Sequence, residues 1–214
     1  MALGLSVGGE GGGDFNKVVK FDARAGRMFR VEREQDSGGQ WSTENVEITN
    51  GFTAVMDLEN IEVGWCLFAA GVAPQLSLVK LGQPLPARPS EQHKQGFRMM
   101  MKLGKSSGGD VREIAATSKA VLGAVDDLHT QYEAGKAANP GKLPIVALTG
   151  SKAIVSTGKG QSSTNYAPIF EITKWVDRPA DLGGAASAKQ EEAPAPKPAP
   201  APVPAAASDD DEEF

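Results

Sequence analysis

Short stretches in which apolar and polar residues alternate recur along most of the chain. Lys17–Asp22 and Arg27–Arg33 both alternate with a period of two, and the turn-forming segment Ala23–Gly26 separates them. Two such stretches around a short turn predict a β-hairpin. The stretch Phe97–Leu103 also alternates, which predicts a strand with Phe97, Met99, Met101 and Leu103 toward the core and Arg98, Met100 and Lys102 on the other side.

Further strands and one helix follow from the same pattern. The expected strands are Glu44–Ile48, Phe52–Asp57, Gly64–Ala69, Gln75–Lys80, Val111–Ala115, Leu143–Leu148, Ala153–Ser156 and Ile169–Val176. Ser118 is the expected N-cap of a helix that ends at Asn139–Pro140–Gly141, because the apolar residues Val121, Leu122, Val125, Leu128 and Tyr132 fall at helical spacing. Gly158–Ser163 is expected to form an open loop.

This element order predicts a mainly β fold: an OB-like small barrel, closed or partly closed, with one α-helix. Trp65, Phe68, Phe52 and Phe170 are assigned to its core. The predicted organisation is a flexible Gly-rich arm at 1–13, an OB-like domain at 14–180, a Pro/Ala-rich disordered linker at 181–208 and an acidic tip at 209–214.

Charge is distributed very unevenly along the chain. Of 22 basic residues, 20 remain after Lys189 and Lys197 are set aside. Of 27 acidic residues, 20 remain after Glu191, Glu192 and the five acids of 209–213 are set aside. The body is therefore neutral, and the net charge of -5 comes from the C-terminal appendage. Nucleic-acid binding would have to rely on a local basic groove and on stacking.

The C-terminal segment is the most distinctive part of the sequence. Its acidic run, Asp209, Asp210, Asp211, Glu212 and Glu213, is followed by Phe214. Consecutive like charges repel one another into solvent, which predicts an extended, mobile tip. The preceding segment 192–207 contains only Ala, Pro, Val, Lys and Glu, a composition that favours polyproline II and holds the tip away from the body.

A globular domain, a low-complexity spacer and an acidic tip with a final Phe resemble the layout of phage-type single-stranded DNA-binding proteins. The tip is similar to the bacterial pattern Asp-Asp-Asp-Ile-Pro-Phe at Asp209, Asp210, Asp211 and Phe214, with Glu212 and Glu213 in place of Ile-Pro. The segment 166–179 is similar to the closing strand of phage DNA-binding proteins. The resemblance implies binding of single-stranded DNA (ssDNA) in replication, recombination or repair, with partner proteins of those processes recruited by residues 209–214.

A binder of unpaired strands needs cations for the backbone and flat side chains on which bases stack. One cluster of candidates lies on the first hairpin and a second on the Phe97–Leu103 strand. The candidate DNA-binding cations and their companion ring are Lys17, Lys20, Arg24, Arg27, Phe29, Arg30, Arg98, Lys102 and Lys159. The alternative is an ordinary solvated strand face, on which Glu32 and Glu34 neutralise the arginines.

Two aromatic residues are candidate stacking platforms. Trp41 lies among polar neighbours that make it hard to bury, although it could also fold back onto the barrel. Tyr166 follows the loop that contains Lys159. The pattern leaves Trp175 undecided between core and surface.

Several function classes are disfavoured by the sequence. Cys66 is the only cysteine and lies in an apolar run, which predicts a buried thiol in a reducing, cytoplasmic setting. His93 and His129 are far apart in the sequence and are expected at the surface, so we expect no metal site, no cofactor and no enzymatic activity. No stretch approaches the roughly 20 apolar residues of a membrane span.

Exposed strand edges favour a homodimer. The rival interpretation of the whole chain is a β-rich structural or assembly protein with a solubilising tail.

Overall fold

The computed structural model describes residues 17–70, 72–158 and 161–182. The predicted arm, the acidic tip and all but two residues of the predicted linker lie outside this range. Asp181 and Leu182, which the sequence placed in the linker, belong to a short 3-10 helix, η3 (Ala180–Leu182), and Leu182 is buried.

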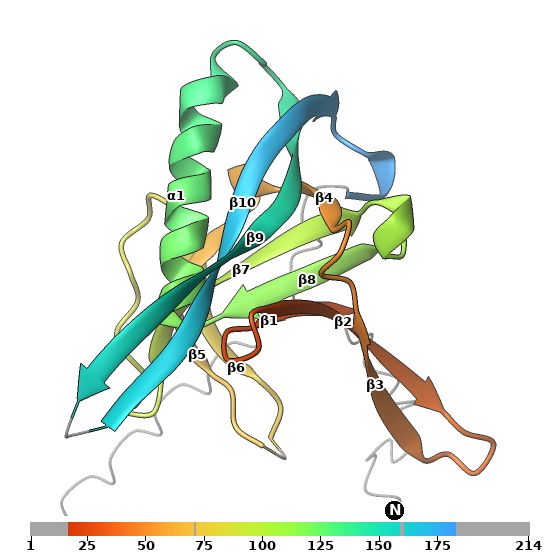
Figure 1. Ribbon diagram of the computed structural model, residues 1–214, viewed down its shortest axis with the longest axis vertical. Helices are drawn as coiled ribbons and strands as arrows, with labels where there is room; N and C mark the ends of the chain where they lie inside the picture. The colour runs from red at the N-terminus through yellow and green to blue at the C-terminus, as the bar shows by residue number, and fades with distance from the viewer. Residues whose placement is uncertain (1–16, 71, 159–160, 183–214) are drawn as a thin grey trace, which may run out of the picture.

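The described residues form a mainly β fold with one α-helix, as predicted (Figure 1). The strands are β1 (Val18–Asp22), β2 (Arg27–Gln35), β3 (Trp41–Glu47), β4 (Thr53–Met56), β5 (Glu62–Leu67), β6 (Gln75–Lys80), β7 (Lys94–Leu103), β8 (Val111–Ala116), β9 (Lys142–Gly158) and β10 (Gln161–Asp177). The helix is α1 (Lys119–Lys136), and two more 3-10 turns are η1 (Leu58–Asn60) and η2 (Lys105–Ser107).

The strands form one strongly curved sheet in the order β10-β9-β4-β7-β8-β1-β2-β3, with β5 paired to β6 and β7. All of these pairs are antiparallel except the parallel pair of β1 and β8. The architecture is OB-like, with α1 inserted between β8 and β9, but the sheet does not close by strand pairing. A hydrogen bond from Tyr166 N to Ala23 O, 2.6 Å long, links β10 to the β1–β2 turn across the opening.

The core lies between the curved sheet and α1. It contains the four side chains of β7 that alternation predicted, Phe97, Met99, Met101 and Leu103, each no more than 2% exposed. The predicted helix is confirmed: Val121, Val125, Leu128 and Tyr132 are buried on the sheet side, and Leu122 is half-buried beside them. The Trp175 ring stacks on Tyr132 with ring centroids 5.6 Å apart, which places Trp175 at the edge of this core.

Two long hairpins project from the body. Figure 1 shows β9–β10 and β2–β3 extending to opposite sides of the lower half of the molecule. The predicted strands Leu143–Leu148 and Ala153–Ser156 are parts of the single strand β9. The prediction of an open loop over Gly158–Ser163 is wrong at both ends, because the pairing of β9 with β10 continues to Gly158 and Gln161.

Two further burial predictions are wrong. Phe68 lies just beyond the end of β5 and is 45% exposed, because the apolar run outlasts the paired strand. His93 is only 5% exposed, and its Nδ1 lies 2.8 Å from Ser90 Oγ within the folded loop before β7. Phe52, Phe170 and Cys66 are buried as predicted, and Trp65 is half-buried with its Nε1 donating to Pro86 O.

Candidate nucleic-acid interface

Strand register brings part of each predicted cationic cluster onto one surface. Val19 pairs with Ile114, and both are buried in the core, so the side chains that alternate with them point away from it. We call this surface the outer face. Its residues are Arg98, Met100 and Lys102 of β7, Val111, Glu113 and Ala115 of β8, Val18 and Lys20 of β1, and Arg27, Phe29, Val31 and Arg33 of β2.

A mostly apolar stripe, interrupted by Glu113, runs across the centre of the outer face. Met100 lies opposite Glu113, which lies beside Val18, and Val18 lies opposite Val31. Phe29 lies opposite Lys20 in the next row. The apolar members of the stripe are half-buried rather than covered. The outer face therefore combines accessible apolar surface with flanking cations.

Three predicted cations on the outer face already have a carboxylate partner. Arg98 Nη2 lies 2.6 Å from Glu62 Oε2, and Arg27 Nη1 lies 2.9 Å from Glu47 Oε2. The Lys102 ammonium lies 2.5 Å from Asp181 Oδ2, and its hydrogen bond holds the pKa of Asp181 below the usual value. Ion pairs between exposed side chains are weak, which applies to the Arg27–Glu47 and Lys102–Asp181 pairs, whereas the Arg98–Glu62 pair is partly buried.

Lys20 and Arg24 differ from these three cations. Lys20 is exposed on β1, and Arg24 is exposed in the β1–β2 turn. Neither forms an ion pair with another residue in the described ranges. Neither charge is therefore neutralised by an ion pair in this part of the structure, and Lys20 lies opposite Phe29.

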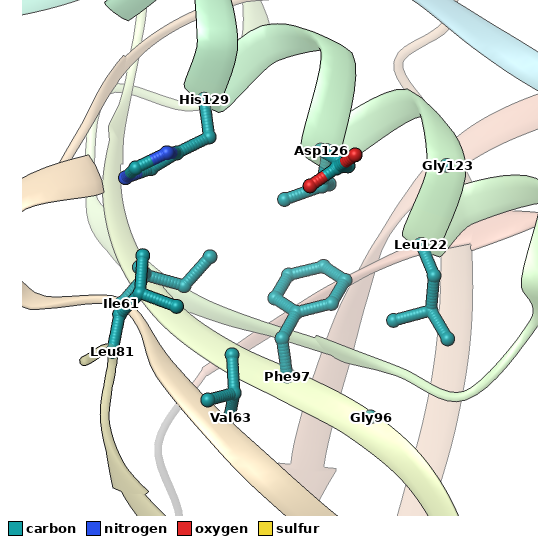
Figure 2. A pocket seen from close by; sticks show the side chains of 10 residues that line it. Ile61, Val63, Leu81, Gly96, Phe97, Leu122, Gly123, Asp126 and His129 are labelled. Carbon is teal, nitrogen blue, oxygen red and sulfur yellow. The ribbon is translucent and has the colours of Figure 1, made fainter. Parts of the chain in front are cut away.

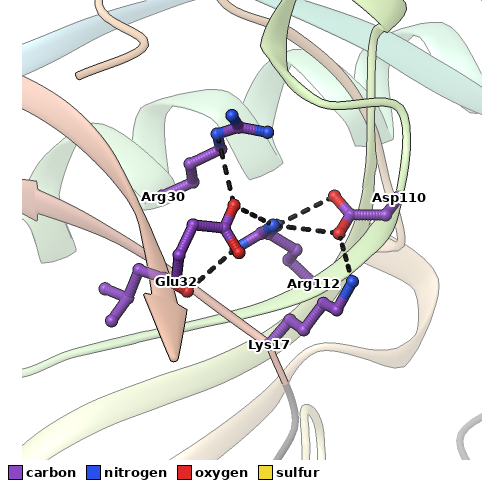
Figure 3. Close-up of polar contacts among 6 residues, drawn as sticks. Lys17, Arg30, Glu32, Asp110 and Arg112 are labelled. Carbon is purple, nitrogen blue, oxygen red and sulfur yellow. Dashed lines mark hydrogen bonds and ion pairs between the residues drawn. The ribbon is translucent and has the colours of Figure 1, made fainter. Parts of the chain in front are cut away.

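Lys17 and Arg30 lie on the opposite side of the sheet from the outer face. Arg30 pairs with the core residue Val19, so alternation turns it inward. Both side chains join a group that we call the Arg112 cluster, shown in Figure 3, which consists of Lys17, Arg30, Glu32, Asp110 and Arg112. Lys17 and Arg30 therefore lie in the Arg112 cluster and do not share a surface with Arg98 and Lys102.

Arg112 is the centre of this cluster and is only 1% exposed. Its guanidinium donates to Asp110 Oδ1 at 2.8 Å, to Glu32 Oε1 at 2.7 Å and to Val31 O at 3.0 Å. Burial alone would raise the pKa of Asp110, but hydrogen bonds from Arg112 and Lys17 hold that pKa below its usual value. Burial likewise opposes the charge of Arg112, yet bonding to Asp110 and Glu32 raises its pKa. These side chains fasten the first hairpin to β8.

Trp41 is 60% exposed at the outer end of the β2–β3 hairpin. It pairs with Gln35, which continues the outward series of β2, so its ring lies on the side of the outer face. The structure confirms the predicted exposure. It also shows that Trp41 is far from Lys20: Trp41 lies at the outer end of the β2–β3 hairpin, and Lys20 lies beside the opposite end of β2.

Tyr166 is half-buried against the β1–β2 turn. A Cβ added to Gly26 would lie 3.0 Å from Tyr166 Cγ, and Gly26 has a φ of +68°, so this close approach depends on glycine. Tyr166 thus lies near Arg24 and Arg27, so its ring and these two cations can contact the same DNA strand. Lys159 lies outside the described residues.

Sequence reasoning missed the carboxylates that neutralise the outer face, Glu47, Glu62 and Asp181. Each is separated from its cation by 20 or more positions, the largest separation being 79 residues between Lys102 and Asp181. It also missed Val18 and Val31 as surface apolar residues, although their alternation with Val19 and Arg30 was a usable signal.

Within the described ranges, no three His, Cys, Asp or Glu side chains converge as a metal site would require. The helix in the described part of the chain does not meet the length and apolarity needed to cross a bilayer. Comparison of the chain with protein-family models, with curated proteins and with solved structures finds no match.

Proposed function

We propose that this protein binds single-stranded DNA without sequence preference and protects it during phage DNA replication, recombination or repair. The observation that carries the proposal is the outer face itself. It gathers Lys20, Phe29 and Met100 from three strands onto one surface, with Arg98 and Lys102 at its edge. Cations beside accessible apolar side chains suit a phosphate backbone with unstacked bases.

The paired cations are compatible with this function. A DNA phosphate that approaches Lys102 replaces the exposed carboxylate of Asp181, and one that approaches Arg98 replaces the partly buried carboxylate of Glu62. Lys20 and Arg24 need no such exchange. Initial contact is therefore at the β1–β2 turn, with Tyr166 beside it, and the strand extends over the outer face toward Trp41.

The acidic tip has two roles in this proposal. It recruits replication or recombination proteins, and its carboxylates compete with DNA for the outer face. A tethered competitor acts through its effective concentration, in the millimolar range for short flexible tethers.

The protein works in the host cytoplasm, where a lone cysteine such as Cys66 stays reduced. Pairing of two copies through sheet edges such as β3 would extend the binding surface.

The decisive experiment is a salt titration of binding to fluorescent oligothymidine. Single-strand binding predicts an affinity that falls steeply with salt, by a log–log slope of about -0.7 per phosphate contacted. Replacing both Lys20 and Arg24 with Ala should reduce the magnitude of that slope by about 1.4. Lys142→Ala is the matched control, since Lys142 is exposed at the start of β9, outside the outer face.

The second candidate is a β-rich structural or assembly protein, and the internally paired cations of the outer face favour it. It predicts no saturable binding of oligothymidine at low salt. That result would refute the DNA proposal. Removal of residues 209–214 tests the tip separately: competition requires tighter binding by the shortened chain at low salt.

A further inference from the structure

Two concave surfaces flank α1, one on each side. The first, which we call the Phe97 pocket, has a volume of about 390 Å³ and lies between α1, β5 and β7. The second, which we call the α1–arm groove, has a volume of about 330 Å³. It lies between the first half of α1 and the β9–β10 arm, defined as residues 150–158 and 161–169.

The two surfaces differ in charge. Figure 2 shows the carboxylate of Asp126 and the imidazole of His129 above the apolar side chains of the Phe97 pocket, and its lining contains no lysine or arginine. The α1–arm groove is lined by Lys119 and Lys152. Both lysines are exposed and lack an ion pair with any residue that the structure describes.

The walls of the α1–arm groove are apolar. On the helix side, Ala120, Gly123 and Ala124 present almost no side chain, which leaves room against the backbone. On the arm side lie Ile154 and Ile169, which are 41% and 43% exposed although both are large and apolar. Asp127 also lines the groove, about two helical turns from Lys119.

We propose that the α1–arm groove binds the chain's own segment Asp209–Phe214. This segment carries five carboxylates next to an aromatic ring, and the groove offers two lysines next to apolar walls. The ring lies between the small helix residues and Ile154, while the carboxylates meet Lys119 and Lys152. Each surface has one aspartate in its lining, Asp126 or Asp127, but only the α1–arm groove has lysines to outweigh it, which makes the Phe97 pocket the poorer receptor.

The tether is long enough for this contact. The described chain ends at Leu182, and residues 183–208 separate it from the tip. At about 3.1 Å per residue in polyproline II, 26 residues span up to roughly 80 Å. Every surface of the domain is within that reach, so chemistry rather than distance selects the docking site.

When Asp209–Phe214 is bound in the α1–arm groove, it does not contact the outer face. Lys152 pairs with Ala167, and the neighbouring pair is Ala153 with Tyr166, so Lys152 and Tyr166 point to opposite sides of the arm. A tip held in the groove hides the Phe214 ring from partner proteins. It reaches the outer face only after it leaves the groove.

Disulfide trapping in the full-length chain tests the proposal without DNA. Glu213→Cys is combined in turn with Ala120→Cys in the α1–arm groove, Leu122→Cys in the Phe97 pocket and Thr130→Cys on exposed α1. The native Cys66 does not interfere, because it is buried and desolvation raises its pKa to about 11. We expect the Ala120→Cys pair to form at least about tenfold faster than the other two, because the tether gives all three pairs a similar effective concentration and only docking in the groove adds to it.

A charge exchange distinguishes docking from chance collision. Lys119→Glu with Lys152→Glu should lower the Ala120→Cys trapping rate to that of the Thr130→Cys pair, and adding Asp209→Lys with Asp211→Lys should restore it. Equal rates for all three cysteine pairs would overturn the proposal, and faster trapping at Leu122→Cys would move the site to the Phe97 pocket. Neither outcome bears on ssDNA binding, which the salt titration measures independently.

Discussion

Arg98 and Arg112 lie on neighbouring strands of one sheet, yet their surroundings assign them to different tasks. Arg98 is on the outer face, its side chain is 21% exposed, and its partner is Glu62. Arg112 points to the opposite side, is 1% exposed, and is held by Asp110, Glu32 and a backbone carbonyl. The difference teaches that burial and the number of partners decide whether a cation is structural or free to meet a ligand.

The largest expected difference concerns stability. Arg112→Met should lower the free energy of unfolding by about 3 kcal/mol, because Asp110 and Glu32 would lose the buried cation that balances them. Arg98→Met should cost about 1 kcal/mol or less, since it breaks one partly exposed pair. Urea denaturation of both variants measures the two values. Equal losses would show that the two arginines are not distinct in role.

The next effect concerns binding at the far end of the outer face. Trp41→Ala should weaken oligothymidine binding by about 1 to 3 kcal/mol through the loss of one stacked base. Its unfolding free energy should change by less than about 0.5 kcal/mol, because the side chain is 60% exposed. Trp41→Phe keeps a ring and should retain most of the affinity. An unchanged affinity in Trp41→Ala would exclude this residue from the interface.

A smaller effect is expected where the outer face meets the start of the C-terminal segment. Asp181→Asn removes the partner of Lys102 and should tighten oligothymidine binding about two- to threefold at low salt. The gain should vanish in a double variant that also carries Lys102→Ala. If Asp181→Asn bound more weakly than the natural chain, Lys102 would not be a phosphate contact.

The smallest effect is the contribution of the Arg112 cluster to the pH dependence of stability. The pKa of Asp110 is lowered in the folded protein, so its contribution to stability is fully present above its unfolded pKa of about 3.9 and is lost as pH falls through the folded value. Asp110→Asn should therefore flatten the decline in melting temperature below about pH 4. Asp181→Asn serves as the comparison, because the pKa of Asp181 is also lowered but its side chain is half-exposed and lies outside the Arg112 cluster. A profile identical to the natural chain's would remove Asp110 from the acid response.

Alternation predicted the local structure well because period two assigns each side chain to one face of a strand. It correctly divided β7 into buried Phe97, Met99 and Met101 and outward Arg98, Met100 and Lys102. It failed at Phe68, where an apolar run continued beyond the last paired residue of β5. Burial there depends on what covers the residue, and no local pattern contains that information.

The candidate site was predicted less completely than the fold. Arg30 and Lys17 were grouped with Lys20 because they are close in sequence, but in a strand odd and even positions face opposite ways. The carboxylate partners of Arg27, Arg98 and Lys102 lie in other elements, so their neutralising effect could not be inferred from neighbouring residues. The exposure of Trp41 was predicted correctly, because it follows from the polar neighbours of Trp41 in the sequence.

The sequence by itself determined the strands, the single helix and the segregation of net charge into the C-terminal segment. These follow from side-chain periodicity and composition, which are local properties. Only the tertiary structure decided that Lys20 and Arg98 share a face, that Arg112 is buried, and that Lys119 faces Lys152 across a groove. Each of these depends on strand register and on the packing of α1, which join residues that the chain itself keeps far apart.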